Sequence, residues 1–166
     1  MLPESWSRRG VLGALSASWL VGAKARALGA ASQVDIAELS VPGASIHRAA
    51  AWQRLLFELI QTTSVEANPS TVQIDPEDPD LFAHPLTVLI GRGALPELSD
   101  DAVEQLRRYV SYGGFLFFDD ASGSRDGPFA QSVRTLCRRL FPTRPMAPLP
   151  GDHSLYRAFF LLDRPV

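Results

Sequence analysis

Residues 86–120 read LTVLIGRGALPELSDDAVEQLRRYVSYGGFLFFDD, and this stretch decides the fold. It holds two apolar runs, residues 86–90 and 115–118, and neither alternates with polar positions. An unbroken apolar run is typical of a parallel strand that is covered on both faces. Between the runs, Ser99 can cap a helix that Gly113-Gly114 would end. The stretch therefore predicts strand, helix and strand, the repeating unit of a parallel sheet.

The flanking sequence extends this alternation of strands and helices. Residues 34–39 predict a first strand and residues 71–74 a short second one. Residues 48–62 predict an amphipathic helix, because apolar side chains recur at three- and four-residue steps. That apolar stripe consists of Trp52, Leu55, Leu56, Leu59 and Ile60. A helix that begins at Pro128 and a buried strand at Phe159-Phe160-Leu161-Leu162 complete the pattern.

Strands that alternate with helices predict an α/β fold, a three-layer sandwich with a mostly parallel, doubly wound, flavodoxin-like sheet. In such folds ligands bind at the carboxyl ends of the strands. We therefore look for functional residues where the predicted strands end.

The first 31 residues predict an export signal that precedes a domain of residues 32–166. Ser7-Arg8-Arg9-Gly10-Val11-Leu12 resembles the twin-arginine motif, and a weakly hydrophobic run, residues 11–23, follows it. Such a run rises only ~20 Å as a helix, whereas a bilayer core is ~30 Å thick, so a membrane anchor is disfavoured. We expect the domain to fold in the cytoplasm and to reach the periplasm or another exported location. A retained, uncleaved signal is the alternative, and contact with a membrane is expected only through this signal.

Charge and cysteine content exclude several classes of protein. The net charge is −2, and because the first 31 residues carry four basic side chains against Glu4, the remainder carries −5. An acidic domain without a basic stripe argues against nucleic-acid binding. Cys137 is the only cysteine, which rules out an intramolecular disulfide. Its helical spacing from Val133 and Leu140 predicts a buried structural thiol.

Asp119-Asp120 ends the second apolar run and is the first candidate for chemistry. Two carboxylates at a strand end can bind Mg²⁺ or Ca²⁺ or supply a general base. The alternative follows from geometry, because neighbouring side chains on a strand point to opposite faces. In that case one aspartate caps the following loop and the other is solvated.

Further candidate ligand-binding residues lie in three loops. Arg92 lies between two glycines after the first apolar run, and Ser124 and Arg125 precede the helix that starts at Pro128. Hydroxyl, amide and guanidinium groups before a helix start can cradle an anion, although an ordinary flexible turn has the same composition. Asp152-His153 follows a proline-rich stretch and can supply a ligand or a proton shuttle. The signature motifs of familiar hydrolases are absent.

Several of these segments together resemble one family, the domain of unknown function numbered 4159. They are Leu98-Ser99-Asp100, Leu106-Arg107-Arg108-Tyr109, Gly113-Gly114-Phe115-Leu116, Asp119-Asp120, Leu140-Phe141-Pro142 and Pro150-Gly151-Asp152-His153 with Tyr156. The resemblance spans about residues 33–163 and implies a class I glutamine-amidotransferase-like fold. Amidotransferases of this fold use a cysteine on a strand-to-helix turn, and no strand exit here carries one. Because members of the family often extend further, the resemblance also implies a truncation after Val166.

Together these observations favour an exported, non-catalytic module of the cell envelope that binds a protein or a small ligand at the carboxyl edge of its sheet. The alternative is a metal-assisted hydrolase that uses Asp119, Asp120, Asp152 and His153. No cofactor is expected except the divalent metal that this alternative requires. A third hypothesis is a scaffold that holds a partner through an open sheet edge.

Overall fold

The computed structural model describes residues 33–158 of the chain. The export signal predicted for residues 1–31 and the strand predicted for residues 159–162 lie outside the described residues. The elements are, in order, β1 (Ile36–Leu39), α1 (Ala49–Thr62), β2 (Val72–Ile74), η2 (Pro79–Ala83), β3 (Leu86–Gly91), α2 (Asp100–Ser111), β4 (Phe115–Asp120), α3 (Pro128–Leu140) and η3 (Ser154–Arg157). In the described part of the chain, no helix is both long enough and apolar enough to cross a bilayer.

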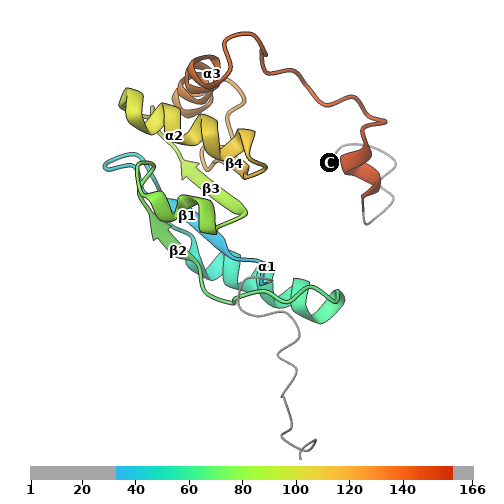
Figure 1. Ribbon diagram of the computed structural model, residues 1–166. Coiled ribbons are helices and arrows are strands. Elements are labelled where there is room, and N and C mark those ends of the chain that lie inside the picture. Colours follow the sequence, from blue (N-terminus) through green and yellow to red (C-terminus); the bar gives the residue numbers. More distant parts are fainter. Residues whose placement is uncertain (1–32, 159–166) are drawn as a thin grey trace, which may run out of the picture. The chain divides into compact units, whose positions relative to one another are not determined.

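The strands form one parallel sheet in the order β2-β1-β3-β4 (Figure 1). From β1 the chain first moves outward to β2, and it then returns to add β3 and β4 on the other side. The winding direction therefore reverses between β1 and β3. In an open α/β sheet this reversal is the point at which loops diverge and a ligand can enter. The predicted doubly wound α/β fold is confirmed.

Helices cover both faces of the sheet and give the three predicted layers (Figure 1). On one face, Leu56 of α1 packs with Ile36 and Val88. On the other face, α2 and α3 pack over β1 and β3 in the larger cluster, which includes Leu39, Leu89, Leu106, Phe129, Val133 and Leu136. The core thus lies on both sides of the two central strands.

The ends of α2 follow the predicted signals. The Ser99 hydroxyl accepts a hydrogen bond from the Ala102 N–H at 3.0 Å. At the other end Gly113 has a φ of 100°, a left-handed conformation that favours glycine. There the Gly114 N–H donates to the Tyr109 carbonyl at 3.0 Å, which closes the helix in a Schellman motif.

Two predictions of burial are wrong. The second apolar run was expected to be covered on both faces, but Phe115 and Phe117 of β4 are 55% and 42% exposed. Among the described helices only α1 lies on that face, and its buried contacts are with β1 and β3. On α1 itself, Leu55 and Ile60 are 52% and 38% exposed although both belong to the apolar stripe. One helix is too narrow to cover this face of a four-stranded sheet.

Candidate functional site

Gly91 forms the centre of the carboxyl edge. The chain after β1 folds back, so that the Ile46 N–H donates to the Ile90 carbonyl at 2.8 Å and Ser45 pairs with Gly91. From the other side, the Ala121 N–H donates to the Gly91 carbonyl at 2.8 Å. A Cβ atom at position 91 would lie 2.3 Å from the ring of Phe129. Only glycine therefore lets the exits of β1, β3 and β4 meet beneath the start of α3.

Glu38 is a buried carboxyl group at this edge, with 2% of its surface exposed. It accepts hydrogen bonds from the Arg48 N–H and from the Thr71 hydroxyl, each at 2.8 Å. Its Oε2 atom also lies 3.6 Å from Nδ1 of His47. A buried carboxyl group needs such partners, and here they tie β1 to the start of α1. Glu38 thereby positions His47 and Arg48 at the edge of the sheet.

Sequence reasoning missed this group. It assigned no role to His47 and included Glu38 only as one residue of the predicted first strand. The sequence did offer one signal. Glu38 is an acidic residue near the end of a strand that must have neighbouring strands on both sides. A carboxyl group at such a position is buried, and it therefore requires hydrogen-bond donors from neighbouring segments.

Asp119 and Asp120 point to opposite faces, as one of the two predicted alternatives requires. Oδ2 of Asp119 lies 3.6 Å from Nη1 of Arg48, so the group is ion-paired and not merely solvated. Oδ1 of Asp120 accepts from the hydroxyl and the N–H of Ser122, at 2.6 and 2.9 Å. The bond from the Ser122 hydroxyl, followed by that from its N–H and one from the Ala130 N–H, lowers the pKa of Asp120. Asp120 thus caps the loop that follows β4.

The loop after β4 contains the predicted anion cradle. The Ser124 N–H donates to the Ser122 hydroxyl at 3.2 Å, and Gly123 has a φ of 70°. The Arg134 side chain donates to the carbonyl of Arg125 at 2.8 Å, which ties the loop to α3. The loop is therefore an organised turn whose conformation Asp120 and Arg134 support.

Asp152 and His153 are not joined to the aspartates of β4. Nδ1 of His153 accepts from the Leu155 N–H at 3.1 Å, which caps η3. Within residues 33–158, no hydrogen bond or ion pair links Asp152 or His153 to Asp119 or Asp120, and no three Asp, Glu, His or Cys side chains are grouped to hold a metal ion.

Each of three strand exits brings an arginine to the carboxyl edge. Arg48 follows β1, Arg92 follows β3 and Arg125 follows β4. Across the described part of the chain, the side chains of Arg92 and Arg125 have neither a hydrogen-bond nor an ion-pair partner. This edge therefore carries two unpaired guanidinium groups beside the paired one of Arg48.

The helices that begin at this edge differ in how their N-termini are satisfied. α2 has the Ser99 cap and two aspartates in its first turn. Neither α1 nor α3 has a side-chain cap or an acidic residue in its first turn. The free N–H groups and dipole of a helix start favour an anion, so the start of α1 adds positive potential beside the arginines, whereas at the start of α3 the Ala130 N–H faces the Asp120 carboxylate.

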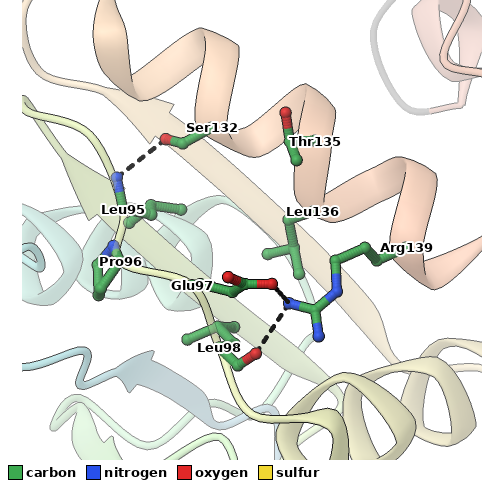
Figure 2. A pocket seen from close by; sticks show the side chains of 8 residues that line it. All are labelled: Leu95, Pro96, Glu97, Leu98, Ser132, Thr135, Leu136 and Arg139. Atoms are coloured by element: carbon green, nitrogen blue, oxygen red, sulfur yellow. Dashed lines mark hydrogen bonds and ion pairs between the residues drawn. The ribbon is translucent and has the colours of Figure 1, made fainter.

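A separate hollow of about 290 Å³ lies between the loop after β3 and α3 (Figure 2). Its polar groups are already used. The Leu95 N–H donates to the Ser132 hydroxyl at 2.9 Å, and Arg139 donates to the Leu98 carbonyl and to Asp100, each at 2.8 Å. Figure 2 shows Ser132 and Arg139 facing this loop from α3. The hydrogen bonds around the hollow therefore hold the loop after β3 in place against α3.

The lone cysteine also has a structural setting. Cys137 lies in α3 and packs against the larger core cluster, and burial raises the pKa of its thiol. A raised pKa disfavours the thiolate that a nucleophile requires. This agrees with the structural role predicted for Cys137, although its side chain is half-buried and not buried as predicted.

Comparison with known proteins places the chain in a family. A family described as "Domain of unknown function (DUF4159)" matches residues 35–166. No curated protein matches the chain.

Proposed function

The chain belongs to the Domain of unknown function (DUF4159) family, and from the geometry of its sheet edge we propose that it is a non-catalytic binding domain for small anionic ligands. The ligand would lie at the carboxyl edge of the sheet, where the winding reverses between β1 and β3. Exported through a twin-arginine signal, the domain would serve in the cell envelope. The class I glutamine-amidotransferase-like fold belongs to the same proposal.

The observation that carries this proposal is the convergence of positive groups at one edge. Arg48, Arg92 and Arg125 follow three strands whose ends meet around Gly91. Two helices, α1 and α3, start there without a cap or an acidic residue. An anionic group such as a carboxylate or a phosphate is the ligand that matches guanidinium groups and free N–H groups.

The geometry supports binding better than metal-assisted hydrolysis. Asp119 faces Arg48, whereas Asp120 faces Ser122 on the other side of the strand. Two carboxylates on opposite faces do not form a common metal site. Their partners instead fix the arginine on one side and the loop on the other, so both aspartates support a binding surface.

We expect Arg48 to contribute directly to anion binding, and titration with inorganic phosphate tests this. Arg48→Ala should weaken phosphate binding by about tenfold, because a hydrogen bond to a charged group is worth about 1.5–3 kcal/mol. Binding can be measured by NMR titration at low ionic strength, where surface charges are least screened.

The matched control is Arg54→Ala. Arg54 lies within α1, six residues after the N-cap residue Arg48, and forms an exposed ion pair with Glu58 at 3.0 Å. It should leave phosphate affinity unchanged. An equal loss of phosphate affinity in both variants would mean that binding depends only on the overall charge of the protein. The proposed site would then be wrong.

A further inference from the structure

Arg48 and Asp119 face each other at the carboxyl edge, and both side chains keep free hydrogen-bonding groups. Nη1 of Arg48 lies 3.6 Å from Oδ2 of Asp119, which is an ion-pair distance but too long for a hydrogen bond. Within residues 33–158, this ion pair is the only polar contact of either side chain. The two side chains are 43% and 36% exposed, so a small ligand can reach both. A free donor therefore lies beside a free acceptor.

Two contacts fix the positions of this donor and this acceptor. The Arg48 N–H donates to the buried carboxyl group of Glu38 at 2.8 Å, which holds the backbone at the start of α1. One turn further along α1, the rings of Trp52 and Phe117 meet edge-on, with 6.3 Å between their centroids. Because Phe117 lies two residues before Asp119 on β4, both side chains point to the same face of the sheet. Arg48 and Trp52 thus oppose Asp119 and Phe117.

A carboxylate beside an anion site restricts which anions can bind there. It only accepts hydrogen bonds, and it repels an anion whose oxygens also only accept. Hydrogen phosphate has both kinds of group. Its unprotonated oxygens can accept from the guanidinium group of Arg48, while its O–H group can donate to Asp119. Sulfate has a similar shape and carries no proton at neutral pH, so it leaves the carboxylate without a donor.

We propose that Asp119 sets the specificity of this site and that the ligand is inorganic phosphate in its hydrogen phosphate form. The inference rests on the anion site proposed above and adds the class of ligand to it. Arg48 attracts any small anion, whereas Asp119 admits the one that brings its own proton. The carboxylate that pairs with Arg48 thus serves as the acceptor for the ligand.

Titration with three dianions of similar shape at pH 8 tests the proposal. The probes are inorganic phosphate, sulfate and methyl phosphate, and at this pH only inorganic phosphate keeps a proton. NMR titration of the full-length protein should show that phosphate binds about tenfold more tightly than the other two, because each of them lacks a hydrogen bond to a charged group. In Asp119→Asn this preference should disappear, since an amide can donate to all three anions.

The matched control is Asp126→Asn. It removes the same charge from the loop after β4, where Asp126 pairs with Arg134 at 3.1 Å, and it should leave the preference for phosphate unchanged. If Asp119 only positioned Arg48, Asp119→Asn would weaken the binding of all three anions by the same factor and the preference would persist.

Two results would overturn the inference and leave the anion site intact. One is equal affinity of the unmodified protein for the three dianions, and the other is a preference for phosphate that persists in Asp119→Asn. Failure of all three dianions to bind would instead overturn the proposed function, and this inference with it.

Discussion

Replacing Phe129 by alanine is expected to lower the free energy of unfolding by about 3–5 kcal/mol, the usual cost of removing a large buried aromatic side chain. Phe129 is 1% exposed and belongs to the core cluster that α2 and α3 form over the sheet. Its ring also lies against Gly91, so the same substitution removes a packing contact at the place where the ends of β1, β3 and β4 meet. Urea denaturation measures the change.

Phe57→Ala is the matched control, because it removes the same atoms from a side chain of α1 that is 55% exposed. It should change the free energy of unfolding by only about 0.5 kcal/mol. Comparable losses in the two variants would contradict the assignment of Phe129 to the core above Gly91.

Replacing Arg8-Arg9 by Lys-Lys is expected to abolish export and leave the folded protein in the cytoplasm. The twin-arginine pair is the feature that identifies the signal, and its charge alone, which lysine retains, would not suffice. Cell fractionation followed by immunodetection measures the distribution. A double variant, Arg54→Lys with Arg138→Lys, changes two exposed arginines of the folded domain and should be exported normally. Normal export of the Lys-Lys variant would refute the signal.

The architecture could be predicted because residues 86–120 carry several independent signals that agree. An apolar run, a capped helix and a glycine pair each restrict the chain locally, and all three indicate the same strand-helix-strand unit. Both ends of α2 therefore lie where Ser99 and Gly113 predicted them.

Burial on the α1 face could not be predicted in the same way. An apolar residue shows which face of an element prefers to be covered, but whether a helix lies over that face is decided by the rest of the sheet. Phe115 and Phe117 show the difference, since α1 reaches this face of β4 through an edge contact of Trp52 with Phe117, at 6.3 Å between ring centroids, and both phenylalanines stay exposed.

Only some residues of the candidate site could be predicted from the sequence. Arg92, Asp119, Asp120, Ser124 and Arg125 follow strands, and the rule that strand exits share an edge identified them. His47 and Arg48 precede a helix and reach the edge only because Glu38, ten residues before Arg48, binds the start of α1. Such a long-range contact leaves no local pattern.

The central claim is that anions bind where α1 and α3 begin, and NMR chemical-shift mapping with inorganic phosphate tests it most directly. The account predicts the largest shifts at the N–H groups of Ala49, Ala50 and Phe129, in the first turns of α1 and α3, with little change at Ala102, where Ser99 already caps α2. Shifts of equal size at the start of α2, or none at the starts of α1 and α3, would contradict it.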